Sequence, residues 1–168
     1  MSLLQKGSLS IGISLLAMTT LCSERVSAQQ SGVIQREIPI VDVPLPALAA
    51  ARTASGSEIT YAKAEIRVDG PLIYELGGQN QQGYEFEIDV TAIGEVVEIE
   101  EEVDSSAVPS PVMRSIERWI PGFQSTSFWR STRPNAVFYE VVGLSADRLD
   151  LHLEISPDAR SFIINVQD

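Results

Sequence analysis

The sequence predicts an α+β protein made of two tandem repeats, each one helix followed by a four-stranded antiparallel meander sheet. Residues 43–103 align with residues 108–168 without a gap, at a constant offset of 65 positions, although only seven of the 61 pairs are identical. Both copies open with Val-Pro-x-Pro and a helix-forming run, and both continue as four short runs separated by turn residues. We therefore expect a first unit at residues 42–104 and a second unit at residues 105–168.

Residues 1–28 have the layout of a secretory signal peptide. The cation Lys6 precedes an apolar run at residues 9–21, and Val26-Ser27-Ala28 offers a cleavage site of the small-x-small type. The apolar run is shorter than the roughly 20 residues that a membrane-spanning helix needs. Cys22 leaves a lipoprotein open as an alternative, although the residue before it is bulky. We expect an exported protein, periplasmic or extracellular, with no stable membrane span.

The composition restricts the class of partner. The chain carries 23 acidic and 12 basic residues, a formal net charge of −11, which repels nucleic acid and anionic lipid and favours a basic partner. Its one cysteine lies in the predicted signal peptide, so the exported protein must be stabilised by a packed core and not by an internal disulfide. The sequence does not fix the oligomeric state.

The first unit follows a segment at residues 29–41 that we expect to be a flexible tether, because it has little periodicity and contains Pro39. Pro44 and Pro46 suit the first turn of a helix, which an alanine-rich run continues until Ser55-Gly56-Ser57. Strands are expected at residues 58–68, 72–76, 84–90 and 95–103, where apolar and polar residues alternate or turn signals intervene.

The second unit repeats this order with a stronger helix signal. Apolar residues recur at three- and four-residue spacing from Val112 to Ile120, and Pro121-Gly122 ends the pattern. Strands are expected at residues 123–130, 136–142, 149–155 and 161–166. One helix covers about one face of such a sheet, so each sheet should keep a second face for water or for a partner.

The second unit resembles the PepSY-like domains of bacterial exported proteins, within the broader group shaped like the beta-lactamase inhibitor protein. The segments that carry the resemblance are Val108-Pro109-x-Pro111-Val112, Pro121-Gly122, Val137-Phe138-Tyr139-Glu140-Val141 and the run from Leu149 to Asp158. The first unit matches more loosely, with alanines where the family has bulky helix residues. The resemblance implies a binding or inhibitory module of the envelope, and it transfers no contact residue.

Titratable residues give no sign of catalysis or of a cofactor. His152 alternates with Leu151 and Leu153, which is typical of a solvated position on a strand. The acidic run at residues 95–104 interleaves with valine and isoleucine, which favours a solvated outer strand over a metal site. Glu85 and Glu87 are two positions apart, and any two such residues of a strand point to the same face, so their proximity is no evidence of an active site. We therefore predict a protein that is not an enzyme and has no metal or cofactor.

Aromatic residues with arginine are the remaining candidates for an interface. If Ala62, Ala64, Ser127 and Trp129 face the helices, then four residues face away from them. These are Tyr61, Phe128, Arg130 and Phe138. We expect them to bind a protein partner, with burial between the two units as the alternative.

The function expected is a protein-binding module that inhibits or modulates an envelope or secreted hydrolase. The alternative is an envelope sensor that binds a small ligand or cation on an acidic sheet face.

Overall fold

The computed structural model describes residues 28–29, 33–67 and 70–166, and it shows one curved antiparallel sheet with two helices. Its ten strands pair in chain order from β1 to β10. The strands are β1 (Ala28–Gln29), β2 (Val33–Glu37), β3 (Tyr61–Arg67), β4 (Ile73–Gln79), β5 (Glu85–Thr91), β6 (Val96–Glu102), β7 (Gln124–Arg133), β8 (Ala136–Leu144), β9 (Asp150–Ile155) and β10 (Phe162–Val166). The predicted signal peptide lies outside the described residues apart from Ala28.

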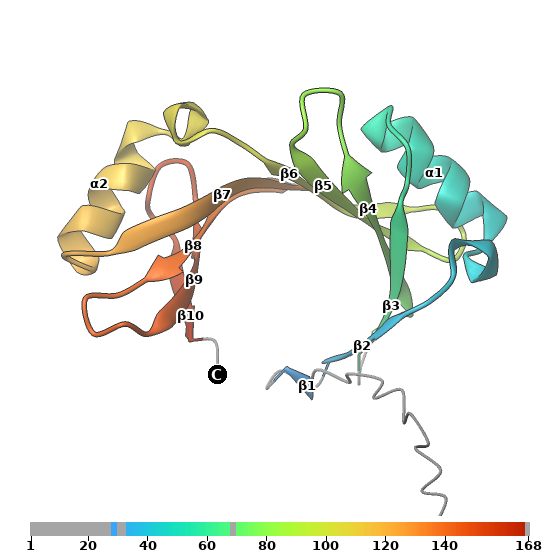
Figure 1. Cartoon of the computed structure of the whole chain (residues 1–168), viewed down its shortest axis with the longest axis horizontal. Coiled ribbons are helices and arrows are strands. Elements are labelled where there is room, and N and C mark those ends of the chain that lie inside the picture. Colours follow the sequence, from blue (N-terminus) through green and yellow to red (C-terminus); the bar gives the residue numbers. More distant parts are fainter. Residues whose placement is uncertain (1–27, 30–32, 68–69, 167–168) are drawn as a thin grey trace, which may run out of the picture.

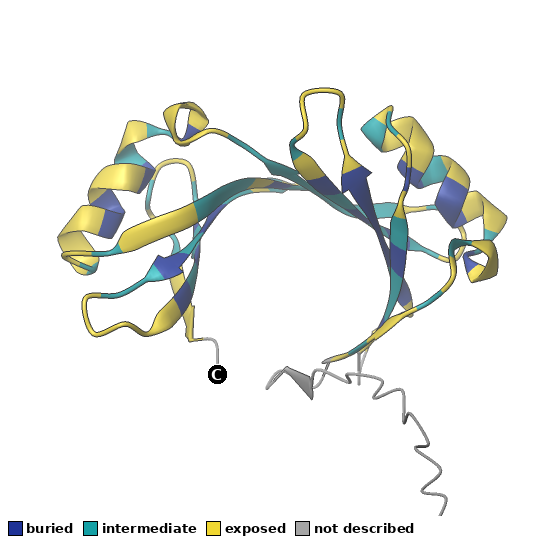
Figure 2. Cartoon of the chain, in the orientation of Figure 1, coloured by how far each residue is buried: buried dark blue, intermediate teal, exposed yellow. Residues whose placement is uncertain are grey.

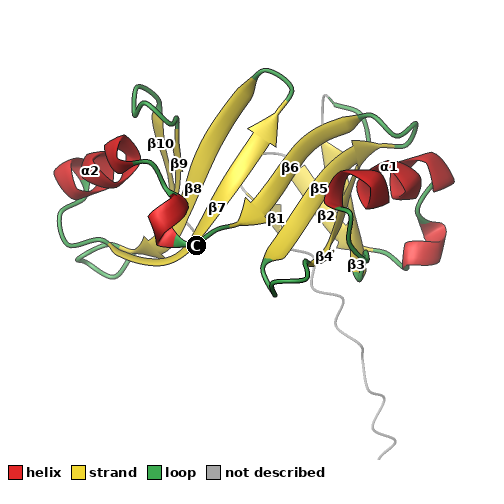
Figure 3. Cartoon of the chain, turned by 90° about the horizontal axis from the view of Figure 1, so that it is seen from above, coloured by secondary structure: helices red, strands yellow, loops and turns green. Residues whose placement is uncertain are grey.

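Both helices lie on the convex side of the sheet, at opposite ends of the arch (Figure 1). They are α1 (Leu45–Ser55) and α2 (Ser110–Trp119), and the short 3-10 helices η1 (Ile40–Asp42) and η2 (Ser105–Ala107) precede them. The view from above shows the strands running past the two helices as one continuous sheet (Figure 3). The side of the sheet without helices is called the concave face below.

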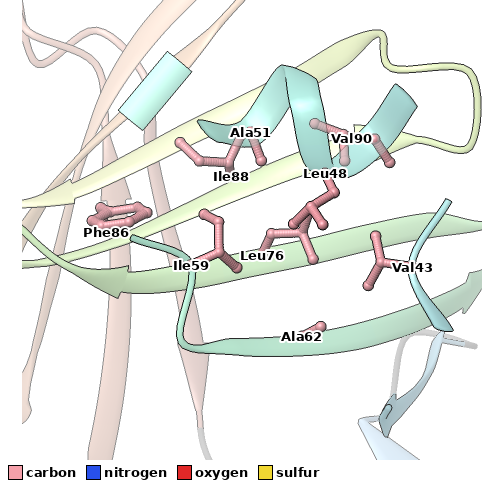
Figure 4. Close-up of a cluster of buried hydrophobic side chains, with 10 residues drawn as sticks. Val43, Leu48, Ala51, Ile59, Ala62, Leu76, Phe86, Ile88 and Val90 are labelled. Carbon is pink, nitrogen blue, oxygen red and sulfur yellow. The ribbon is translucent and has the colours of Figure 1, made fainter. Parts of the chain in front are cut away.

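Each helix begins at a Val-Pro-x-Pro segment and buries one face against the sheet. Proline occupies the first turn of both helices, and α1 ends at Gly56, whose φ of 61° suits a residue without a side chain. The small residues Ala47 and Ala51 let α1 approach the strands closely, and Leu48 and Ala51 lie over Ile88 and its neighbours (Figure 4). The outward faces of both helices are exposed (Figure 2).

The two helix-and-meander units share one sheet. Strand β6, the last of the first unit, pairs with β7, the first of the second, through Ile99↔Thr132 to Glu102↔Trp129. The predicted order of helix then strands is confirmed in part, and the two four-stranded meanders are joined edge to edge in a single sheet, which the sequence left open. Two apolar clusters, one under each helix, stabilise the two ends of the sheet on its convex side.

The segment expected to be a tether contains strand β2. Val33–Glu37 pairs with β3 over five residues, from Val33↔Arg67 to Glu37↔Lys63, and η1 follows it. The sequence signal was weak because the strand is short and ends near Pro39, but the free edge of β3 offers it a hydrogen-bonding partner. The expectation of an irregular segment at residues 29–41 is therefore wrong for Val33–Glu37.

A β-bulge in β7 reverses the predicted orientation of that strand. The offset of 65 places Ser127 opposite Val141, as Ala62 lies opposite Leu76, but the register shifts between Ser125 and Ser127, and Phe128 pairs with Val141 instead. One extra residue exchanges the two faces of a strand. Phe128 consequently packs against the apolar cluster under α2.

Four residues of β7 thus have the opposite orientation to the prediction. Phe128 and Arg130 point to the helix side, while Ser127 and Trp129 point to the concave face. The expectation that Phe128 and Arg130 face away from the helices is wrong.

Replacing Phe128 by alanine is expected to lower the free energy of unfolding by about 2–3 kcal/mol, somewhat below the cost of deleting a fully buried phenylalanine. Phe128 packs against buried Val141 and the cluster around α2, and a smaller side chain leaves a cavity there. Urea denaturation measures the change. Trp119→Ala is the control, because that ring is 62% exposed. Equal, small effects of both changes would place Phe128 outside the core.

Candidate functional site

The concave face is formed by the strand side chains that alternate with those packed under the helices. Its central residues in β3 to β9 are Tyr61, Lys63, Glu65, Glu75, Glu87, Asp89, Glu98, Glu100, Glu102, Trp129, Ser131, Arg133, Phe138, Glu140, Val142, His152 and Glu154. Hydrogen bonds between residues of different strands confirm that these side chains share a face. Within the described residues, no helix covers this surface (Figure 1).

Carboxylates are concentrated on this face. In strands β2 to β10, as far as side chains are described, Glu101 is the carboxylate that points to the helix side, and all the others point to the concave face. The acidic run of β6 was expected on a solvated outer strand, but β6 lies in the middle of the sheet. Its Glu98 side chain is 15% exposed, so the curvature of the sheet crowds the carboxylates against their neighbours.

Three of these carboxylates converge at the centre of the face. Oxygens of Glu98, Glu100 and Glu140 all lie within 4.8 Å of one another. Burial, followed by the negative charges of Glu140 and Glu98, raises the pKa of Glu100 to about 9. Glu100 therefore keeps its proton at neutral pH and donates a hydrogen bond to Glu140.

Arg133 supplies the main positive charge beside this cluster. Its Nε atom lies 2.8 Å from Glu98 Oε1, and its Nη2 atom lies 2.8 Å from Glu154 Oε2 and 3.9 Å from Glu140 Oε1. Its guanidinium also lies over the Phe138 ring, 4.9 Å from the centroid. Ser131 donates a further hydrogen bond to Glu98. One arginine thus joins carboxylates from three strands.

His152 lies on the concave face, half-buried and paired with Glu140. Its Nε2 atom is 2.6 Å from Glu140 Oε2, and this hydrogen bond raises the pKa of His152 despite burial. Burial opposes ionisation of Glu140, but the hydrogen bond and charge of His152 outweigh it and lower the pKa of Glu140. The sequence predicted that His152 lies on the polar side of its strand, but it did not predict the hydrogen bond to Glu140.

The first unit contributes a second, smaller group of paired side chains. Tyr61 donates a hydrogen bond of 2.7 Å to Glu87, and Lys63 Nζ lies 2.5 Å from Glu75 Oε1. The Lys63 ammonium also lies 5.3 Å from the centroid of the Tyr61 ring. Burial, then the hydrogen bond to Glu87, raises the pKa of Tyr61, so its hydroxyl remains a donor.

Two of the four predicted interface residues lie on the concave face. These are Tyr61 and Phe138, one in each unit. Arg130 is on the opposite side, where it pairs with Glu101. Phe128 is partly buried and packs against the apolar cluster under α2. The arrangement brings aromatic rings, paired cations and many carboxylates to one surface.

The carboxyl groups at the centre of the concave face are suited to binding a positively charged group. The Glu98–Glu100–Glu140 cluster has oxygens that a hard cation accepts as ligands. Glu100 holds a proton, however, and Glu140 and Glu98 already bind His152 and Arg133. Calcium takes six to eight oxygens, so an ion would have to displace these contacts.

No helix in the described part of the chain is long and apolar enough to cross a bilayer.

Comparison with solved structures finds a similar fold in proteins of Bacteroides. A structure described as a periplasmic protein from Bacteroides eggerthii has a TM-score of 0.61 at 9% identity and covers 74% of this chain and 88% of its own. A BLIP-like protein from Bacteroides fragilis has a TM-score of 0.54 at 18% identity and covers 78% of this chain and 87% of its own. A DUF2874 family protein from Bacteroides uniformis has a TM-score of 0.56 at 11% identity and covers 73% of this chain and 88% of its own.

These likenesses establish the fold alone, because each identity is low. No protein-family model matches the chain. No curated protein matches it either. The comparisons identify no catalytic family, and they relate this chain in fold to a periplasmic protein, a BLIP-like protein and a DUF2874 family protein of Bacteroides.

Proposed function

We propose that this protein is an exported, non-catalytic module that binds another protein through the concave face of its sheet. The observation that carries the proposal is the position of α1 and α2, which both lie on the convex side and leave the other face uncovered (Figure 1). The fold likeness to a BLIP-like protein supports a protein partner, and the sharper form of the proposal is inhibition of an envelope or secreted hydrolase.

The side chains of this face are held in place before a partner arrives. Tyr61 is bonded to Glu87, and Phe138 lies under the Arg133 guanidinium. Neither ring has to be ordered on binding, so less conformational entropy is lost when a partner covers it. Tyrosine and arginine are also among the residues that contribute most at interfaces.

A sensor of small cations is the second candidate, and the Glu98–Glu100–Glu140 cluster is the observation that favours it. A cation that binds only the folded protein must raise the melting temperature. Titration with calcium chloride tests this directly. We expect little change, because binding would have to remove the proton from Glu100 and displace Arg133 and His152 from their partners.

Alanine at both Tyr61 and Phe138 is expected to weaken capture of the partner by about tenfold or more, a loss typical of interface aromatic residues. The exported protein, immobilised through a tag, is exposed to envelope extract, and bound proteins are quantified by mass spectrometry. Both rings lie on the concave face, one in each unit.

Trp119→Ala is the matched control, because this exposed ring belongs to α2 on the convex side. It should leave capture unchanged. Circular dichroism verifies that all variants are folded. If the Tyr61→Ala/Phe138→Ala variant captured the same proteins as the wild type, or if only Trp119→Ala lost them, the concave face would not be the binding surface.

A further inference from the structure

Charge is segregated between the two sides of the sheet. The concave face carries the described strand carboxylates apart from Glu101, and its described basic residues are Lys63, Arg133 and His152, whose pKa is raised by the hydrogen bond to Glu140. Arginines on the helix side include Arg52 of α1, Arg114 and Arg118 of α2, and Arg130 of β7. The negative charge of the strands therefore lies mainly on the concave face.

The cations of the concave face do not neutralise its centre. Arg133 is shared among Glu98, Glu140 and Glu154, and His152 binds Glu140. Oxygens of Glu98, Glu100 and Glu140 lie within 4.8 Å of one another, and burial together with the negative charges of Glu140 and Glu98 raises the pKa of Glu100. A positive group placed among these three oxygens would be attracted by two charges at once, and it would favour ionisation of the third.

We infer that the partner presents a basic surface to the concave face, and that one of its lysine or arginine side chains inserts among Glu98, Glu100 and Glu140. This inference rests on the proposed function and adds the chemistry of the partner. An ammonium or guanidinium offers several N–H donors to the three carboxyl groups. Aromatic rings accept cations on the same face, as Lys63 over Tyr61 and Arg133 over Phe138 already do.

A side chain of a protein fits this position better than a bare divalent ion. With one oxygen each, the three carboxyl groups would supply only three ligands, and calcium takes six to eight. Their existing bonds to Arg133 and His152 can remain when a single ammonium hydrogen-bonds to them. The aliphatic stem of a lysine or arginine can also lie against the neighbouring apolar surface of Phe138 and Val142.

The probe is a displayed library of random peptides selected on the immobilised full-length exported protein. We expect the selected peptides to be enriched in lysine and arginine relative to the unselected library. The strongest of them should bind more weakly as salt rises from about 0.05 M to about 0.3 M, because salt screens charge–charge attraction. Selected peptides without an excess of basic residues would overturn the inference.

The decisive variant is Glu100→Lys, which places the chain's own ammonium between Glu98 and Glu140. We expect it to reduce the affinity of the selected peptides by about tenfold or more, while the melting temperature stays the same or rises. Glu117→Lys makes the same substitution on the exposed convex side of α2 and should change the affinity less than about twofold. Equal binding to both variants would contradict the inference.

Further variants and a calcium titration distinguish a basic partner from a partner of different chemistry and from a metal ion. If Glu100→Lys does not fold, Glu98→Gln and Glu140→Gln are tested singly, and unchanged affinity in both overturns the inference. Peptides that lose affinity for the Tyr61→Ala/Phe138→Ala variant but not for Glu100→Lys would leave the proposed function standing and refute the basic partner. Peptides insensitive to every concave substitution would refute both the proposed function and the basic partner.

Stoichiometric displacement of the peptides by calcium chloride, with a raised melting temperature, would overturn the inference and assign the cluster to a metal ion.

Discussion

Replacing Arg133 by alanine will lower the free energy of unfolding by about 3 kcal/mol, whereas the same change at Arg130 will cost less than about 1 kcal/mol. Both residues belong to β7, but they lie on opposite faces of the sheet. Arg133 contacts Glu98, Glu140 and Glu154, whose side chains are 15%, 9% and 19% exposed. Its removal leaves partly buried carboxylates without their cation, and we place the cost at the low end of the range for buried pairs because Arg133 is itself 34% exposed.

Guanidinium denaturation of both variants measures the difference. Arg133→Lys keeps the charge but loses the planar fork that joins several carboxylates, so it should restore only part of the stability. Arg130 pairs with Glu101, and both side chains are more than 40% exposed, which explains its small expected effect. Similar losses from Arg133→Ala and Arg130→Ala would show that the concave network does not stabilise the fold.

Stability will fall as pH rises from about 5 to about 9. The pKa of Glu100 is raised from 4.5 to about 9, so between these values the folded protein holds a proton that the unfolded chain releases. Each pH unit in this window costs up to about 1.4 kcal/mol. Glu100 is faced by Glu87 from β5, Glu98 from β6 and Glu140 from β8. Arg133 from β7 and His152 from β9 contact Glu98 and Glu140, and Glu154 from β9 pairs with Arg133.

Two of these neighbours shape the same profile. The pKa of His152 is also raised, so the stability it contributes is present below 6.5 and is lost as pH rises through its folded pKa. The pKa of Glu140 is lowered, so its contribution is present above 4.5 and is lost as pH falls through its folded pKa. Maximum stability is therefore expected near pH 5.

Glu100→Gln tests this assignment, because glutamine resembles the protonated acid and does not titrate. Its melting temperature should fall much less between pH 5 and pH 9 than that of the wild type. Glu117→Gln, on the exposed side of α2, should keep the wild-type profile. A wild-type slope in Glu100→Gln would mean that another group controls the dependence.

Local sequence patterns predicted the elements well. The prolines that open both helices, the turn at Gly56 and the alternation in β5 and β9 all reflect interactions within a few residues of the chain. Burial follows the predicted alternation there, with Phe86, Ile88 and Val90 buried in β5, and Leu151, Leu153 and Ile155 in β9. Such short-range periodicity is readable without tertiary contacts.

The errors came from features that depend on strand register. The bulge between Ser125 and Ser127 has no glycine to indicate it, yet one extra residue turned Phe128 from the predicted interface toward the apolar cluster under α2. The acidic run of β6 was recognised, but the residues that surround Glu100 on β7, β8 and β9 come from the second unit. Only the pairing of β6 with β7 brings the two halves of this cluster together, and no local pattern specifies that contact.

Carboxyl footprinting of the protein, with and without the partner that it captures, tests the central claim most directly. Carbodiimide coupling labels accessible carboxylates, and mass spectrometry reports the extent at each residue. We predict that binding protects Glu87, Asp89 and Glu102 on the concave face and leaves Glu101 and Glu117 on the convex side labelled as before. Protection of Glu101 and Glu117 with unchanged labelling of the concave carboxylates would show that the partner docks on the helix side.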